Sequence, residues 1–359
     1  MRRIGLWVFL FGVLALPARA EQRQFGDWFA TCDNLRNCVA IGVRDFAGDD
    51  SSQGYVRIAR DGGRLAPPTV SVIVDEVADI DPVAPWTLQV DGVAPAGVPA
   101  LTGRRTDTDT GSEDHHDRRV VTSGPAAAAL IAAMRNGHEL TVQRGGTRLA
   151  TVPLTGLAAA LLWIDDQQHR VGTTTALIHP GQRPASAVPP PPAPTVIARG
   201  RLPAQTGLPR RAPGAVRAIL STPQQGCEDD RSATPYGVAR LGPDLLLWNM
   251  PCSSGAYNEL SQYVVSDARG GHARLVLLPQ PPGATPTPLE QPFNSRFDVR
   301  TGILINDEKG RSLGDCGTFT EWLWDGQAFR LLRNRAMGEC RGVRVADWPV
   351  TYQAHIRGR

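Results

Sequence analysis

The segment between residues 314 and 340, GDCGTFTEWLWDGQAFRLLRNRAMGEC, combines residue types that could do chemistry. Cys316 could act as a nucleophile, and the Trp-Leu-Trp motif could stack on a sugar or an aromatic ligand. A nucleophilic cysteine needs a neighbouring base to lower its pKa and a reducing compartment, but no histidine lies near Cys316 in the sequence. We therefore expect Cys316 to form a disulfide bond with Cys340.

The dipeptide Asp325-Gly326 inside this segment predicts a β-hairpin with a two-residue turn, because both central positions of such a turn favour a positive φ. The resulting register places Trp322 opposite Phe329 and Trp324 opposite Gln327. Trp322 is then expected in a core row. Because Trp324 lies beside a polar residue near the turn, we expect it to be the more exposed ring. Trp324 and Gln327 are therefore a candidate ligand or partner surface.

A second candidate site is the polar run RRTDTDTGSEDHHDRR between residues 104 and 119. His115 and His116, with the acidic residues beside them, offer ligand types that bind zinc or copper. Because consecutive residues in a loop make a poor closed metal cage, we expect a solvated surface loop and keep metal binding as an alternative. The sequence predicts no cofactor.

The motifs of several hydrolase classes are missing, since the sequence contains no G-x-S-x-G, S-x-x-K or H-E-x-x-H pattern. Acid–base catalysis would need distant groups to meet in one cleft, for example Asp315 or Glu321 with His272 or His355. Asp165-Asp166 could hold a cation, but we expect one of these residues to be exposed and the other to bind the turn that follows.

The first twenty residues predict a secretory signal peptide. Arg2 and Arg3 form a basic start, residues 4–16 are almost entirely apolar, and Ala18-Arg19-Ala20 has the small-x-small pattern of a cleavage site. We predict cleavage after Ala20 and a periplasmic location. No later stretch is long and apolar enough for a membrane span, so the mature chain is expected to be soluble and not membrane-spanning.

The mature chain has six cysteines in three separated clusters. In an exported protein, such cysteines are typical of disulfide partners. Six cysteines allow 15 pairings, and pairing the sequence neighbours is the simplest choice. We therefore predict the bonds Cys32–Cys38, Cys227–Cys252 and Cys316–Cys340.

A change in composition divides the chain. Ten prolines lie between Pro180 and Pro213. Because proline fixes φ and lacks the amide donor, this segment is expected to be an extended, semi-rigid linker. We predict a signal peptide at 1–20, an N-terminal domain at 21–180, a linker at 181–214 and a C-terminal domain at 215–359.

The predicted fold is mainly β with some α. In the N-terminal domain, strand-like segments accompany two helix patterns, at residues 126–135 and 157–168, and a hairpin at Gly145-Gly146. This pattern predicts an α+β domain with an antiparallel sheet. The C-terminal domain alternates short strand-like segments with Gly, Pro and Asp turns, which predicts an all-β sandwich or small barrel.

Four ordered segments resemble the domain of unknown function 1176 family. They are FGDWFATCDNLRNCVAIG near the start, LLWIDDQQHRVGTTTALI before the linker, CSSGAYN in the C-terminal half, and KGRSLGDCG with WLWDG near the end. The resemblance covers essentially the whole mature chain. It implies an exported protein of a Gram-negative envelope and supplies no activity or catalytic residues. Separately, AMRNGHELTV and the helix pattern after it resemble the invasion-associated locus B type of periplasmic domain.

The small net charge of +3 and the lack of a dense basic run argue against nucleic-acid binding. We predict a non-enzymatic, disulfide-stapled binding or interaction protein of the bacterial envelope, with an envelope protein or a glycan as partner. Two alternatives stay open. One is an envelope hydrolase or carbohydrate-binding enzyme whose site assembles in the C-terminal domain, and the other is a periplasmic metal-binding protein. The sequence leaves the oligomeric state open.

Overall fold

The computed structural model describes most of the chain that follows the predicted signal peptide. Within the described ranges the fold is mainly β, with three α-helices and several antiparallel sheets, which confirms the predicted fold class at this level. No sheet formed by the described strands closes into a barrel. The division into two domains stays a prediction. The described ranges are 22–44, 54–75, 85–101, 104–106, 117–220, 234–284 and 288–358.

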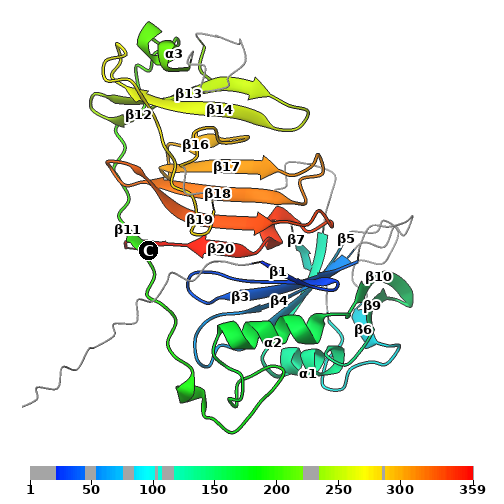
Figure 1. Cartoon of the computed structure of the whole chain (residues 1–359). Coiled ribbons are helices and arrows are strands. Elements are labelled where there is room, and N and C mark those ends of the chain that lie inside the picture. Colours follow the sequence, from blue (N-terminus) through cyan, green and yellow to red (C-terminus); the bar gives the residue numbers. More distant parts are fainter. Residues whose placement is uncertain are drawn as a thin grey trace, which may run out of the picture.

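The N-terminal half is built on a seven-stranded sheet, shown in blue to cyan in Figure 1. Its strands are rich in valine and isoleucine, which suit a pleated, buried surface. All neighbouring strands run antiparallel. The strand order is β1 (Arg23–Phe25), β2 (Trp28–Cys32), β3 (Cys38–Val43), β4 (Gly54–Arg60), β5 (Thr69–Asp75), β8 (Asp117–Ser123) and β7 (Arg104–Thr106).

Two helices, α1 (Gly124–Met134) and α2 (Leu157–Gln167), lie on one face of this sheet (Figure 1). Their apolar side chains, Leu130 and Leu161 among them, share a core cluster with Trp28 and with valines of the sheet. Both helices were expected from the sequence and are confirmed. Neither is long and apolar enough to cross a membrane, and the same holds for every helix in the described ranges.

A three-stranded sheet adjoins these helices and contains the hairpin predicted at Gly145-Gly146. Both glycines have positive φ and connect Arg144 directly to Thr147 across the turn. The order of this sheet is β10 (Thr147–Pro153), β9 (Glu139–Arg144) and β6 (Trp86–Val90).

The C-terminal half contains two antiparallel sheets that share one hydrophobic cluster. Leu247 and Tyr263 enter this cluster from the first sheet, and Leu304 and Trp322 enter it from the second. The first sheet has the order β12 (Gly237–Gly242), β13 (Leu245–Ser254), β14 (Glu259–Ser266) and β15 (Arg274–Leu275), with helix α3 (Gly214–Leu220) beside it. The second has the order β16 (Arg296–Asp298), β17 (Ile303–Lys309), β18 (Gly317–Trp324), β19 (Phe329–Met337) and β20 (Val350–Gln353).

The proline-rich segment is extended and is attached to the rest of the chain at several points. Val188 is buried and its carbonyl accepts a hydrogen bond from Arg64 Nε at 2.8 Å. Farther along, the short strand β11 (Val196–Ile197) pairs in parallel with β21 (His355–Ile356), close to the end of the chain. This segment therefore contacts both halves of the molecule.

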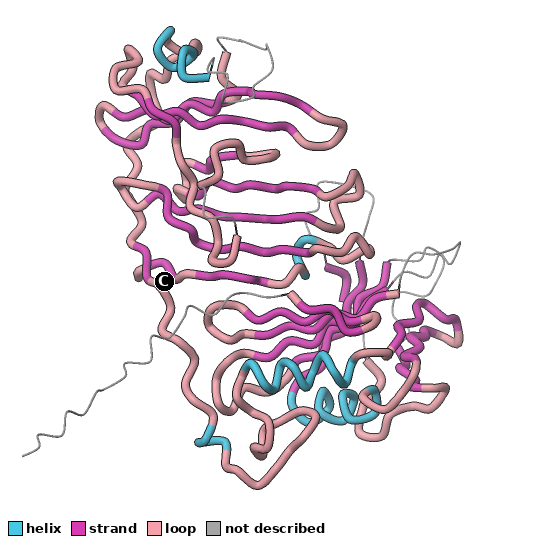
Figure 2. Tube along the Cα trace, viewed as in Figure 1, coloured by secondary structure: helices cyan, strands magenta, loops and turns pink. Residues whose placement is uncertain are grey.

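The second face of the seven-stranded sheet packs against the chain that follows β19. Phe29 and Ile41 from the sheet form one cluster with Met337, Val343 and Trp348. Figure 2 shows the five-stranded and seven-stranded sheets as neighbouring groups of strands. The two halves of the chain thus share a packed interface, and its polar part is described below.

Candidate functional site

The cysteines form disulfide bonds wherever the structure describes them. The predicted pairs Cys32–Cys38 and Cys316–Cys340 are both formed. Cys252 is also disulfide-bonded, and Cys227 lies outside the described residues. Cys316 is therefore not a free nucleophile.

Asp315, a candidate acid or base, belongs to a fixed ion pair. Its carboxylate accepts hydrogen bonds from Arg311 Nε at 2.7 Å, from Arg311 Nη2 at 2.6 Å and from the Gly342 N–H at 2.6 Å. Burial acts to raise the pKa of Asp315, but the hydrogen bonds outweigh it and hold the pKa below its ordinary value. The carboxylate lies beside the Cys316–Cys340 sulfurs. Because disulfide sulfurs are not thiolates, this group is not suited to binding zinc.

The prediction that Trp324 is an exposed ring is wrong. Its side chain is 3% exposed and packs into the core shared by the two C-terminal sheets. The error lies in the register, since Trp324 pairs with Phe329 and not with Gln327. The Asp325 carboxylate widens the loop by accepting the N–H groups of Gln327 and Ala328, both at 2.8 Å. Gln327 stays exposed on that loop, so the pair forms no joint ligand surface.

Trp322 lies in the core, as predicted, and is fully buried. Its indole N–H donates to the carbonyl of Pro279 at 2.7 Å. The Trp324 Nε1, in contrast, is buried and has no hydrogen-bond partner in the described part of the chain. Buried indole N–H groups usually find a partner, so the two rings form a natural comparison.

Replacing each tryptophan by phenylalanine tests this difference. Both substitutions remove a similar apolar volume, but Trp322→Phe also leaves the Pro279 carbonyl without its donor. We expect Trp322→Phe to lower the free energy of unfolding by about 1 to 2 kcal/mol more than Trp324→Phe does. Urea unfolding of both variants under oxidising conditions measures the difference. Equal losses would show that the Trp322 hydrogen bond contributes nothing net.

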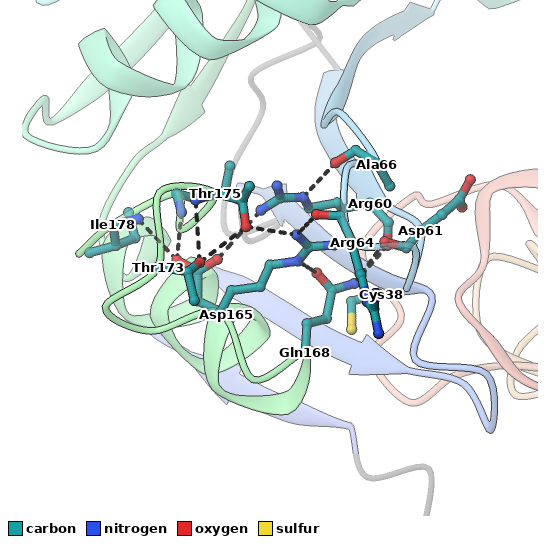
Figure 3. A network of polar contacts seen from close by, with 12 residues as sticks. Cys38, Arg60, Asp61, Arg64, Ala66, Asp165, Gln168, Thr173, Thr175 and Ile178 are labelled. Carbon is teal, nitrogen blue, oxygen red and sulfur yellow. Dashed lines mark hydrogen bonds and ion pairs between the residues drawn. The ribbon is translucent and has the colours of Figure 1, made fainter. Parts of the chain in front are cut away.

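A buried polar network follows helix α2 and is drawn in Figure 3. Asp165 is fully buried and accepts the N–H groups of Leu177 and Ile178 at 2.7 and 3.0 Å, while Asp166 is exposed. This arrangement confirms that one carboxylate binds the turn that follows. Asp165 also lies 3.6 Å from Arg60 Nη1. Burial raises the pKa of Asp165, against the effect of its hydrogen bonds and of the arginine.

Gln168 and Arg170 complete this network and are both buried. The Gln168 amide donates to the carbonyls of Arg36 and Arg60 at 2.8 and 3.0 Å (Figure 3). The Arg170 guanidinium donates to Gln168 Oε1 and to the Gly63 and Arg64 carbonyls. Because these donors reach main-chain acceptors that are distant in the sequence, the network joins separate parts of the N-terminal half and has a structural role.

The network continues into the loop closed by the Cys32–Cys38 disulfide. Asn34 in this loop exchanges two hydrogen bonds with the main chain of Gln353, at 3.0 and 2.8 Å. Asp33 accepts a third from the Gln353 side chain at 2.5 Å. The disulfide loop therefore connects the α2 network to strand β20 in the other half of the chain.

The other predicted acid–base groups have separate surroundings. Glu321 lies 3.9 Å from Arg333, His355 belongs to β21, and His272 lies in a turn that Asp267 closes through main-chain hydrogen bonds. No hydrogen bond or ion pair between described residues joins these groups to one another or to Asp315. The His115-His116 loop lies outside the described residues, and its metal binding stays a prediction.

A group of charged residues lies where the seven-stranded sheet meets the five-stranded sheet. We call it the arginine junction, and it consists of Arg57, Arg119, Arg333 and Arg335 with the carboxylates of Glu321 and Asp347. Asp347 Oδ2 accepts hydrogen bonds from Arg119 Nη2 and from the Tyr55 hydroxyl, both at 2.5 Å. Asp347 is 3% exposed and belongs to the short 3-10 helix Val345–Asp347.

Three elements position the guanidinium groups of the arginine junction. The register of the seven-stranded sheet places Tyr55 opposite Ile73 and Ile73 opposite Arg119, so Tyr55, Arg57 and Arg119 share one face. Arg335 comes from β19, where it lies over the Phe319 ring at 5.7 Å. Burial lowers the pKa of Arg57 and Arg335, and neighbouring arginines lower both further, while Asp347 acts in the opposite direction.

Comparison with known proteins places the whole chain in one family. A family model described as "Protein of unknown function (DUF1176)" matches residues 22–355. The chain belongs to the DUF1176 family. This DUF1176 chain is also similar to the uncharacterized protein YpfG of Escherichia coli (strain K12), with 32% identity over 373 residues, which cover 96% of this chain and 97% of YpfG. No solved structure matches the chain.

Membership in the DUF1176 family confirms the resemblance noted from the sequence, while the resemblance to invasion-associated locus B domains stays a prediction. The sequence of this DUF1176 chain does not predict the arginine junction. Its residues come from β4, β8, β18, β19 and the helix before β20, so no local motif contains them. A local signal was Arg57 in the middle of a strand whose neighbouring residues Val56 and Ile58 are apolar.

Proposed function

We propose that this protein is an exported periplasmic binding protein that contacts a component of the bacterial envelope through the arginine junction. The observation that carries the proposal is the concentration of four arginines around two carboxylates at the meeting of two sheets. Arginine stays protonated in proteins and presents several fixed donors. Such a group recognises a ligand but does not transfer protons, so binding fits this site better than acid–base catalysis.

Three observations support the setting of this proposal. The first twenty residues have the pattern of a secretory signal. The disulfides Cys32–Cys38 and Cys316–Cys340 suit an oxidising compartment. The carboxylates of Asp315 and Asp165, two candidate catalytic groups, accept hydrogen bonds from Arg311 and from the Leu177 main chain. These bonds give both carboxylates a structural role, which weakens the alternative of an envelope hydrolase.

The proposal is tested by affinity capture from a native periplasmic extract, with the full mature chain as bait. The wild type is compared with Arg57→Gln, which removes one charge from the junction, and with Arg148→Gln on the exposed β9–β10 hairpin. We expect at least one envelope component to be retained by the wild type and by Arg148→Gln and to be lost from Arg57→Gln. Identical retention by all three baits would contradict binding at the junction.

A further inference from the structure

We propose that the arginine junction is an oxyanion site that takes a phosphate or carboxylate group of a small ligand. This inference rests on the proposed function, because it names the chemistry that the junction recognises. Planar guanidinium groups match the oxygens of phosphates and carboxylates, and charge assistance makes these hydrogen bonds short and strong.

The charges of the described residues leave the junction short of anions. Glu321 faces Arg333 at 3.9 Å, and Asp347 binds Arg119 directly. Arg57 and Arg335 have no carboxylate of their own at ion-pair distance among the described residues, although both feel the charge of Asp347. The four arginines and two carboxylates of the junction therefore leave a formal excess of two positive charges, which Asp61 offsets in part at Arg57.

The excess charge coincides with unused hydrogen-bond donors. The Nε atoms of Arg57 and Arg119 are buried and have no hydrogen-bond partner in the described part of the chain. A buried donor without an acceptor is destabilising, and a charged one more so. An incoming oxyanion would supply both the acceptor atoms and the missing negative charge.

Arg170 is an example of an arginine in this chain whose donors are satisfied by the protein itself. Arg170 is fully buried, and its Nε, Nη1 and Nη2 atoms all donate to acceptors of the protein. Among the described residues, no such set of acceptors is bonded to Arg57. The contrast favours an external acceptor at the junction.

The junction is also held ready for a ligand. The Arg335 guanidinium carbon lies 5.7 Å from the centre of the Phe319 ring, a cation–π contact that helps to hold the guanidinium in place. The bonds from Arg119 and Tyr55 to Asp347 hold β8 and β4 against the helix Val345–Asp347. Preorganised donors of this kind lose little freedom when a ligand binds.

Isothermal titration of the oxidised mature chain with inorganic phosphate tests the inference, with chloride adjusted to constant ionic strength. We expect the wild type to bind phosphate saturably and Arg148→Gln to bind it with the same dissociation constant. In Arg57→Gln and in Arg335→Gln the dissociation constant should rise by roughly tenfold or more. Parallel titrations with succinate show whether a phosphate or a carboxylate is preferred. Circular dichroism identifies any variant that has not folded. If one of the two junction variants fails to fold, the other still tests the inference.

The inference is overturned if the wild type binds neither phosphate nor succinate saturably, or if both junction variants bind as well as Arg148→Gln. If Arg57→Gln loses envelope capture but the wild type binds neither anion, the oxyanion site is wrong and the proposed function is still supported. If capture and anion binding are both insensitive to Arg57→Gln, the two proposals fail together.

Discussion

Replacing Asp347 by asparagine is expected to lower the free energy of unfolding by about 3 kcal/mol, because removing one partner of a buried ion pair leaves an uncompensated charge. Asp347 is almost fully buried, and three arginines of the junction feel its charge. Arg119 is partly exposed, with 21% of its side chain accessible, so the loss falls at the lower end of the range for buried pairs. Urea unfolding of the oxidised protein at neutral pH measures it.

Tyr55→Phe is the matched control for this prediction. It removes a neutral donor from the same carboxylate and leaves the charge in place, so we expect a loss of about 1 kcal/mol. If Asp347→Asn and Tyr55→Phe cost the same, the charge of Asp347 contributes nothing beyond an ordinary hydrogen bond, and the account of the junction as a charge cluster is wrong.

The second large effect is expected from Asp165→Asn in the network behind helix α2. Asp165 is fully buried, and the side chain of its partner Arg60 is 5% exposed. The substitution removes the negative charge that interacts electrostatically with both Arg60 and Arg170. We expect a loss of about 3 to 5 kcal/mol in the free energy of unfolding.

The neighbouring substitution Asp166→Asn provides the comparison, because Asp166 is exposed and adjacent in the helix. It should change the free energy of unfolding by no more than about 0.5 kcal/mol. Thermal and urea unfolding of the two variants measure both losses. A loss in Asp165→Asn alone reports the buried charge, whereas equal losses would report an effect of charge at the end of the helix. A small loss in Asp165→Asn would mean that the two main-chain hydrogen bonds, which asparagine can still accept, account for its role.

Local patterns in the sequence predicted the elements that depend on local chemistry. The glycine pair at 145–146 fixed a two-residue turn, and the helix from Leu157 was expected from its apolar period. The same reasoning failed at the hairpin between β18 and β19. At Asp325-Gly326 the aspartate side chain accepts two main-chain N–H groups and an Arg330 guanidinium, which stabilises a wider loop than the dipeptide alone predicts.

The burial of Trp324 could not be predicted for a second reason. Its main-chain carbonyl accepts the Gly200 N–H at 2.8 Å, and Leu202 packs against the same core. Both residues belong to the proline-rich segment, whose composition predicts an extended chain but not what that chain contacts. The arginine junction shares this property, since Tyr55 and Asp347 are separated by 292 positions. Single-sequence periodicity carries no information about contacts over such distances.

The bonds between Asn34 and Gln353 have a consequence for the order in which the protein can fold. They join residues that are 319 positions apart, and β11 pairs with β21 through Val196 and His355. One face of the N-terminal sheet is therefore covered only when the segment that contains Met337, Val343 and Trp348 is available to pack on it. Contacts of such long sequence separation slow folding, so we expect the sheet face around Phe29 and Ile41 to be covered late in folding.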